Sequence, residues 1–559
     1  MTRANGSASL GRAPPPVRRT LALALLALAA PTAASAHVDS SALFAAAVRQ
    51  PTPVFVVSGH GWGHGVGLAQ YGAYGYAKHG LGYRAILAHY YTGTTIGVAP
   101  VKRVRVLLAN GKAQLTISSK ADFTVTDATG EKHDVAAGMV TLGPKLKLKV
   151  DAATKAKALP GPLLFGPGTQ PLELGRPYRG QIQVSVGGGK LRAIDVVGLE
   201  PYLQGVVPAE MPHTWAPEAL KAQAVAARSY ALSHLRTGDF DLYPDTRSQV
   251  YRGVAGEAPE TNAAVQATAG QVVLYAGRIA KTFFFSTSGG RTMSAADAWG
   301  TPIPYLVSVP DPYDTLSPYH DWGPFAFTAT RLAKALHAPG RLLDVQTQTN
   351  ASGRVASVTA VGANGESTAT GAAVRKALGL RSTWFSVGVV SLSPPADATP
   401  IVYGAQAKLT GLARAVTGVG LESRAATAKT WASAGRVKAA SDGSFTVSVK
   451  PKLTTWYRLA IGTLRTAQVR LAVAPRVRFD LSSSKTSLSG LVRPVLPNAL
   501  VEIQRLAGTA WRTVARTRVD ANGDFVATVR LHKGSYRARV TPGRGFVPGT
   551  TKPLEVVSG

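Results

Sequence analysis

The chain has 559 residues, a formal net charge of +32 and no cysteine. Its length predicts two to four domains, and a hydrophobic content of 45% is enough for folded cores, so a disordered protein is excluded. The lack of cysteine excludes disulfides, thiolate zinc sites and cysteine nucleophiles. The positive charge predicts an anionic partner.

The beginning of the chain has the pattern of a secretory signal. Arg18 and Arg19 precede an apolar run over 21–30, and the small residues Ala-Ser-Ala follow at 34–36. We therefore expect residues 1–36 to be a signal peptide, by either the general or the twin-arginine route. An exported protein meets the anionic cell wall, so we expect a secreted, wall-associated protein with no nucleic-acid partner.

The stretch SGHGWGHGVGLAQYGA, which begins at Ser58, has glycine at every second position for ten residues. It follows an apolar run over 53–57 that predicts a strand. If the strand continues, its period of two puts the glycines on one face and His60, Trp62 and His64 on the other. A bare face suits either a closely packed second strand or the floor of a groove for a flat polymer. The two histidines lack a nearby third ligand, so no metal site is expected.

Short strands are predicted from Val101 to Ile194, separated by turn signals. The sequence APEALKAQAVAARSYALSHL then predicts a helix from Pro217, with Glu218 in its first turn. Because this helix is alanine-rich and apolar on nearly every side, we expect it to be buried. Mixed strands and short helices continue to Leu380.

Residues 391–400 have the composition of a linker, and an internal repeat follows. LTGLAR recurs as LSGLVR and DGSFTVSV as NGDFVATV, 79 or 80 residues later. This pattern predicts two small β-sandwich modules, at 401–475 and 476–559. The two modules contain 25 Lys and Arg but 7 Asp and Glu, so we expect them to bind anionic wall polymers. The expected fold class is α+β: a β-rich catalytic domain with buried helices, then two all-β modules.

The segment VVGLEPYLQGVVPAEMPHTWAPEALKAQAVAARSYAL, at 196–232, closely resembles the hallmark of the sporulation stage II protein D and amidase-enhancer family. TSGGRTMSAADAWG, YLVSVPDPYD and the glycine-rich stretch resemble it too, and the similarity covers roughly 54–387. In that family the glycine-rich motif normally closes the domain. Here it precedes the rest, so a circularly rearranged domain is expected over 37–390.

Sporulation members of this family are lytic transglycosylases that cleave between N-acetylmuramic acid and N-acetylglucosamine and leave a 1,6-anhydro end. The resemblance implies that Glu210 is the catalytic residue. Pro208 and Pro212 bracket it, which predicts a stiff loop, and apolar neighbours such as Met211 predict a raised carboxyl pKa. Ordinary glycosidases need two carboxylates. One suffices if the attacking group belongs to the sugar, and Glu218 fits better as a first-turn helix residue.

The sequence also suggests residues that bind substrate. These candidates are Trp62, His64, Gln70, Lys221, Arg228, Ser286, Ser288 and Arg291. The two cations on the predicted helix could contact glycan oxygens or pair with Glu210 or Glu218. The polar residues around Gly289 and Gly290 could donate hydrogen bonds to sugars or stabilise a turn of the backbone.

No cofactor and no metal are expected. Some family members hold zinc with cysteine and histidine around a segment that matches 241–253 here. This chain has Tyr243, Arg247 and Ser248 at those positions, so the zinc site is not carried over.

The leading expectation is a secreted peptidoglycan lytic transglycosylase held on the wall by its basic modules. The alternative is a non-catalytic enhancer of an N-acetylmuramoyl-L-alanine amidase, in which Glu210 would be dispensable. A third interpretation is a polysaccharide-binding adhesin that neither cleaves nor assists a partner.

Overall fold

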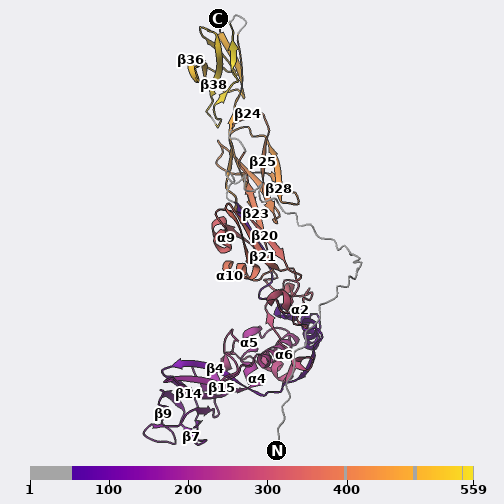
Figure 1. Cartoon of the computed structure of the whole chain (residues 1–559), viewed down its shortest axis with the longest axis vertical. Coiled ribbons are helices and arrows are strands. Elements are labelled where there is room, and N and C mark those ends of the chain that lie inside the picture. Colours follow the sequence, from indigo (N-terminus) through magenta and orange to yellow (C-terminus); the bar gives the residue numbers. More distant parts are fainter. Residues whose placement is uncertain (1–52, 396–398, 482–486, 544, 558–559) are drawn as a thin grey trace, which may run out of the picture.

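The computed structural model describes residues 53–395, 399–481, 487–543 and 545–557, and the predicted signal peptide lies outside these ranges (Figure 1). The described part is β-rich with fewer helices, which is compatible with the predicted α+β class. None of its helices has both the length and the apolar character needed to cross a bilayer. Figure 1 shows the units following one another along one long axis, with the carboxyl-terminal strands at one end.

An antiparallel β unit occupies 103–198, where short strands were predicted. Its larger sheet has the order β4 (Arg103–Lys112), β15 (Lys190–Gly198), β14 (Gln181–Gly187), β11 (Leu163–Gly166), β6 (Phe123–Thr126) and β7 (Lys132–Val135). The smaller sheet has the order β13 (Pro177–Tyr178), β12 (Leu172–Glu173), β5 (Leu115–Ser119) and β8 (Gly138–Leu142), and β9 (Lys147–Leu148) pairs with β10 (Lys157–Ala158). Alternate side chains of these strands form one apolar core.

A helical unit follows, built around a helix that the sequence predicted to be buried. In α6 (Pro217–Ser233) proline occupies the first turn, and twelve side chains are buried, most of them alanine or aliphatic, so this prediction is confirmed. Around it lie α2 (Gln70–Lys78), α3 (Tyr83–Tyr90), α4 (Leu199–Gln204), α5 (Val207–Glu210), α7 (Pro259–Ala267) and α8 (Ala295–Trp299). Its short sheets are β17 (Arg278–Ile279), β16 (Gln271–Tyr275) and β3 (Thr95–Val98), and the parallel pair β18 (Phe284–Phe285) and β2 (Leu68–Ala69).

The strand before the glycine-rich stretch lies in the middle of a long sheet. This sheet has the order β19 (Asp321–Thr328), β1 (Val54–His60), β23 (Phe385–Leu392), β25 (Ala407–Arg414) and β28 (Ser444–Val449). Beside it lie β20 (Leu342–Thr349), β21 (Val355–Gly362), β22 (Gly365–Thr370), α9 (Ala329–Leu336) and α10 (Gly371–Leu378). β1 is antiparallel to β23, so the two ends of the domain predicted over 37–390 lie side by side.

The carboxyl-terminal repeats form two further β units. The first adds β27 (Ala432–Arg436), β26 (Gly420–Ala425), β29 (Thr455–Ile461), β30 (Leu464–Arg465) and β31 (Val469–Leu471), and β24 (Ile401–Val402) pairs with β32 (Val473–Ala474). The second has β33 (Arg476–Leu481), β34 (Ser487–Arg493) and β37 (Asp524–Thr528) opposite β36 (Ala510–Arg518), β35 (Leu500–Ala507), β38 (Gly534–Thr541), β39 (Gly549–Thr550) and β40 (Leu554–Val556). Each repeat has its own apolar core.

The boundary expected at 391–400 falls partly inside a strand. Ser391 and Leu392 belong to β23, which pairs with β25 of the first repeat. The nearly buried carboxylate of Asp344 also accepts from the Arg414 guanidinium, with Nη1 at 2.9 Å. The first repeat is therefore joined to the preceding unit by a shared sheet and an ion pair.

The strand does not continue into the glycine-rich stretch, so the condition for two alternating faces is not met. β1 ends at His60, and the four later glycines of the alternating series have φ angles between +72° and +120°. Such left-handed residues break the two-residue period, and glycine adopts them at little cost. The glycine-rich stretch makes single backbone hydrogen bonds to separate segments instead of a strand ladder. Gly61 N–H donates to His320 O, and Gly63 N–H donates to Arg381 O.

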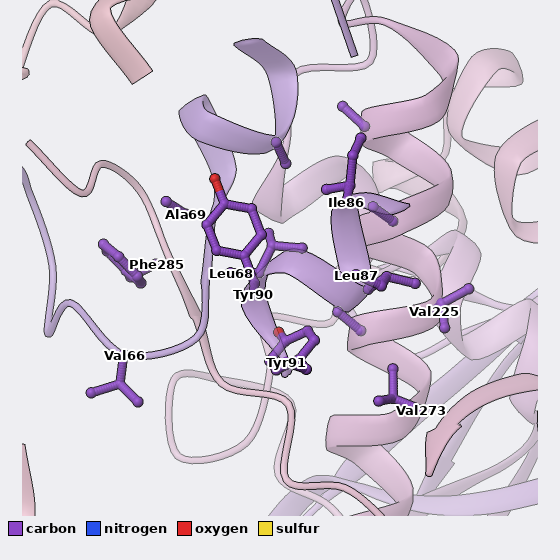
Figure 2. Close-up of a cluster of buried hydrophobic side chains, with 14 of the residues drawn as sticks. Val66, Leu68, Ala69, Ile86, Leu87, Tyr90, Tyr91, Val225, Val273 and Phe285 are labelled. Atoms are coloured by element: carbon purple, nitrogen blue, oxygen red, sulfur yellow. The ribbon is translucent and has the colours of Figure 1, made fainter. Parts of the chain in front are cut away.

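Close packing explains why side chains are missing along this stretch. A Cβ atom on Gly67 would lie 2.1 Å from the carbonyl oxygen of Phe283. Figure 2 shows the neighbouring apolar side chains Val66, Leu68 and Ala69 within the buried cluster that also holds Tyr90. A second backbone approaches closely at Gly61 and Gly67, whereas buried side chains fill the space at Gly63 and Gly65.

We expect Gly67→Ala to destabilise the protein strongly, because the substitution combines a left-handed φ of +78° with the contact to Phe283 O. Alanine in this conformation costs roughly 1–2 kcal/mol before any clash. Gly93→Ala is the matched control, since its φ is +69° but nothing lies within 4 Å of the added carbon. Urea unfolding followed by tryptophan fluorescence should give a clearly larger loss for Gly67→Ala; equal losses would contradict the packing argument.

Candidate active site

Glu210 is the last residue of the four-residue helix α5, and Pro208 lies in the first turn of that helix. The predicted stiff loop is therefore wrong for the residues before Glu210, because proline is compatible with a first helical turn. Met211 after it is extended and buried. The carboxyl group thus projects from a short, well-packed helix end.

The surroundings of Glu210 favour its protonated form. Burial raises the pKa of this carboxyl, and three weaker effects oppose the increase. These are hydrogen bonds from the Gln70 side chain and the Val250 backbone N–H, together with the charge of Arg252. The expected increase in pKa is confirmed in direction, and a carboxyl group of this kind can act as a general acid near neutral pH.

Gln70 connects the glycine-rich stretch to the catalytic candidate. It is the first residue of α2, directly after β2, and its side chain is 8% exposed. Its Nε2 lies 3.5 Å from Oε1 of Gln223, a fully buried residue of α6. Gln70 donates to Glu210 as well, so the structure places it beside the carboxyl, where it holds that group in position.

A second segment supplies the other donor to Glu210. Gln249 lies beside Val250; its Oε1 accepts from the Tyr202 hydroxyl at 3.2 Å, and its Nε2 donates to Ala227 O of α6 at 3.3 Å. The next residue, Tyr251, donates its hydroxyl to the buried Asp195 at 2.8 Å. These bonds fix the backbone that presents the Val250 N–H.

The positions that carry zinc ligands in some relatives form a different cluster here. The Arg247 guanidinium lies 3.8 Å from the centre of the Tyr243 ring and pairs with Asp245. Ser248 Oγ accepts the backbone N–H of Tyr243 at 3.1 Å. A phenol, a guanidinium and a hydroxyl that contact one another do not form a zinc ligand set, so these residues do not fit that metal.

Trp62, a predicted binding residue, belongs to a row of aromatic rings whose other members the sequence did not single out. Trp62, which is 41% exposed, contacts Tyr319 edge to face at 4.5 Å between ring centroids. Tyr71, next to Gln70, contacts Trp215 at 4.7 Å, and Tyr74 stacks on the same indole at 4.6 Å. Backbone hydrogen bonds link the two halves of the row, because Ser286 O accepts the Tyr71 N–H at 3.0 Å and the next residue, Thr287, exchanges hydrogen bonds with Trp62.

The aromatic row carries a cation and partly exposed ring surfaces. The Arg381 guanidinium lies 4.1 Å from the Tyr319 ring centroid and 5.1 Å from that of Trp62. Tyr71, Tyr74 and Trp215 are each partly exposed. The sequence does contain a signal for this row: tyrosines at 71 and 74, just after the alternating glycines, and a tryptophan at 215, between Glu210 and α6. Only the fold brings these distant residues together.

His64 serves the fold rather than an open surface. Its Nε2 lies 3.1 Å from Phe284 O, and its Nδ1 accepts the Val66 N–H at 3.1 Å, so the tautomer protonated on Nε2 satisfies both nitrogens. Desolvation lowers the pKa of this ring to about 4, which keeps it neutral. His60 instead pairs with Asp321 at 2.5 Å. The two histidines therefore have separate partners.

The two predicted cations of α6 pair with carboxylates other than Glu210. Lys221 Nζ lies 2.6 Å from Glu218 Oε1. Arg228 is fully buried; it donates from Nε to Glu200 at 3.0 Å and from Nη1 to Gln271 O at 3.0 Å. Both cations therefore pair with a helix carboxylate: Lys221 with Glu218, as one of the two alternatives predicted, and Arg228 with Glu200.

The group around Gly289 and Gly290 is divided between the surface and the interior. Ser288 is buried and donates from Oγ to Asp314 at 2.8 Å. Ser286 accepts the Tyr71 N–H on its carbonyl oxygen at 3.0 Å, which places it beside the aromatic row. Arg291 is exposed, and its carbonyl oxygen accepts from the buried Arg354.

One cluster with the composition of a metal site lies elsewhere. Within the described ranges, Asp127, Glu131 and His133 are the group of acidic and histidine ligands with atoms within 4.8 Å of one another. They lie at the hairpin of β6 and β7, in the unit that Figure 1 places far from α5. His133 Nδ1 lies 2.9 Å from Asp151 Oδ2, and this contact raises the pKa of the ring, so the histidine already has a carboxylate partner within its own unit.

Comparison with known proteins finds similarity over the part of the chain that contains Glu210. The family model described as stage II sporulation protein (SpoIID) matches residues 187–275, which include Glu210 and α6. An uncharacterised protein of Brachyspira hyodysenteriae is 31% identical over 214 residues, covering 37% of this chain and 57% of that protein.

Two relatives from Bacillus subtilis are similar over shorter stretches. The amidase enhancer is 42% identical over 113 residues, covering 20% of this chain and 15% of that protein. Stage II sporulation protein D is 39% identical over 145 residues, covering 23% of this chain and 42% of that protein. The chain thus spans less than two thirds of each of these relatives. Residues 187–275, which contain Glu210 and α6, are therefore similar to the stage II sporulation protein (SpoIID) family.

Proposed function

We propose that this protein is a secreted, wall-associated lytic transglycosylase that cleaves peptidoglycan glycan strands. The observation that carries the proposal is the carboxyl of Glu210, whose pKa is raised by burial and to which the Gln70 side chain and the Val250 N–H donate, beside a row of partly exposed aromatic rings. Similarity to the SpoIID family over this part of the chain supports a role at the cell wall.

The reaction needs one carboxyl group that gives and then takes a proton. Protonated Glu210 donates its proton to the glycosidic oxygen, and the bond from that oxygen to C1 of N-acetylmuramic acid breaks. The resulting carboxylate accepts the proton of the C6 hydroxyl as its oxygen attacks C1, which forms the 1,6-anhydro ring. The proton count closes within one turnover, and the attacking oxygen comes from the substrate.

The aromatic row is the proposed surface for the glycan. Sugar rings present apolar C–H faces that pack on indole and phenol rings, while Tyr hydroxyls and the Arg381 guanidinium bond to their edges. Trp62 lies at one end of the row, and Trp215 contacts Tyr71, the residue that follows Gln70. Of the predicted binding residues, Trp62, Gln70 and Ser286 adjoin this surface or Glu210.

A second function is favoured by one observation, the similarity to an amidase enhancer. In that case the protein would bind glycan strands and assist a wall amidase as its partner, and Glu210 would be dispensable. The two functions differ in one measurable product, because only the transglycosylase releases anhydro-sugar ends.

We expect Glu210→Gln to abolish cleavage while the fold and glycan binding persist. The change is nearly isosteric and removes only the proton, and a positioned acid or base contributes roughly 10²–10⁴-fold to rate. Mass spectrometry of purified peptidoglycan after incubation should show anhydro ends with the wild type and none with the variant. Glu260→Gln, an exposed carboxyl paired with His213, is the control. Product from Glu210→Gln within a few-fold of wild type would rule out the proposed acid.

We expect activity to fall as pH rises, because the acid form of Glu210 is required and its pKa is raised. The raised pKa also means that this group favours the folded state at low pH and loses that contribution as pH rises through the folded-state pKa. Gln70→Leu removes a donor that lowers this pKa, so the alkaline limb of the kcat/KM profile should move to higher pH. Gln266→Leu, on the exposed side of α7, should leave it in place. A shift to lower pH in Gln70→Leu would contradict the assignment.

We expect Trp62→Ala to weaken glycan binding by roughly 3- to 10-fold, since an aromatic contact contributes about 0.5–1.5 kcal/mol. The effect should appear in KM, or in the Kd measured with the inactive Glu210→Gln protein. Phe325→Ala removes a ring of similar exposure on β19 and serves as the control. If both variants bind glycan equally well, the row is not the binding surface.

A further inference from the structure

The outer face of one sheet in the first carboxyl-terminal repeat carries alternating arginine and tryptophan side chains. In β26 and β29, Arg424 lies opposite Trp456, and in β29 and β31, Trp456 lies opposite Arg470. Because side chains alternate between the faces of a strand, the neighbours Tyr457 and Leu459 point to the buried core. The arginine and tryptophan residues therefore share the face away from that core.

The rings and guanidinium groups on this face form a continuous ladder. The Arg424 guanidinium lies 5.3 Å from the Trp431 ring centroid and 5.5 Å from that of Trp456. The Arg458 guanidinium lies 4.0 Å from the Trp431 ring centroid, and the Arg470 guanidinium lies 5.9 Å from that of Trp456. The order is Arg458, Trp431, Arg424, Trp456, Arg470, in which each ring lies between two cations.

The ladder keeps an excess of positive charge. Glu422 neutralises part of it by pairing with Arg458 at 2.8 Å and with Arg465 at 2.9 Å. Among the residues that the structure describes, Arg424 and Arg470 have no carboxylate within 4.0 Å. Two guanidinium groups thus keep N–H donors for an external anion.

The chemistry of the ladder fits a polymer that alternates charge with an uncharged linker. A guanidinium that stacks by its face leaves its edge free, and that edge matches two oxygens of a phosphate group. The indoles between the cations offer apolar surface to a carbon linker, and their packing limits the motion of the arginine side chains, which lowers the entropy cost of binding. We propose that this face binds a linear polyol-phosphate polymer of the cell wall.

The second repeat provides an internal comparison, because its face is similar but shorter. Arg537 lies 4.3 Å from the Trp511 ring centroid, and Glu502 pairs with Arg516 and Arg539, as Glu422 does with its two arginines. The residue that corresponds to Arg424 is Gln504, which accepts from Arg537 at 2.8 Å. The longer ladder and its unpaired cations make the first repeat the binding face.

The test measures binding of the mature protein to purified poly(glycerol phosphate) at low salt. The double variant R424Q/R470Q should weaken binding by roughly 10-fold or more and reduce its salt dependence. K408Q/K450Q is the matched control, since it removes two exposed charges of the same repeat, one on β25 and one directly after β28. It should change binding less than about 2-fold, as expected for screened surface charge.

Three outcomes would overturn the proposal: equal losses in both double variants, no loss in R424Q/R470Q, or binding of polyglutamate as tight as that of the phosphate polymer. Arg470 is exposed, so R470Q alone covers the case in which the double variant fails to fold. This proposal rests on the proposed function only in placing the protein at the cell wall. Cleavage of polymer-free peptidoglycan is measured separately and should be unchanged in R424Q/R470Q, so the two proposals can fail independently.

Discussion

The candidate site depends on how closely the glycine-rich stretch approaches the backbone around Phe283. The chain can reach that distance only without side chains and with left-handed turns, because a Cβ at Gly67 would overlap the Phe283 carbonyl oxygen. The buried guanidinium of Arg354 fills the equivalent space at Gly65 and donates to Ser288 O. This packing sets where α2 begins, and the first residue of α2 is Gln70, the side chain that holds Glu210.

The chemistry of the site was largely predictable, because it depends on local sequence. The apolar neighbours of Glu210 indicated a raised pKa, and the alanine-rich pattern after Pro217 indicated a buried helix. Both properties follow from residues within one or two turns of the position concerned. The choice between a loop and a short helix at Pro208 was decided by packing that the local sequence does not encode.

The partners of the site were not predictable, because they come from distant parts of the chain. Gln70 is separated from Glu210 by more than a hundred residues, and Tyr319 from Trp62 by still more. A sequence also cannot show which of several nearby carboxylates an arginine will choose. Arg228 of α6 pairs with Glu200, which lies in the first turn of α4. This pairing occupies the guanidinium within the protein.

The sheet that joins β1, β23 and β25 has a mechanical consequence. If the carboxyl-terminal repeats are held on a wall polymer, a pull on them is transmitted through the ladder of hydrogen bonds between Val389–Leu392 and Gly411–Arg414. The adjacent ladder passes it to β1, the strand that leads directly into the glycine-rich stretch. Tension from the anchored end therefore reaches the segment that positions Gln70, without crossing a flexible hinge among the described strands.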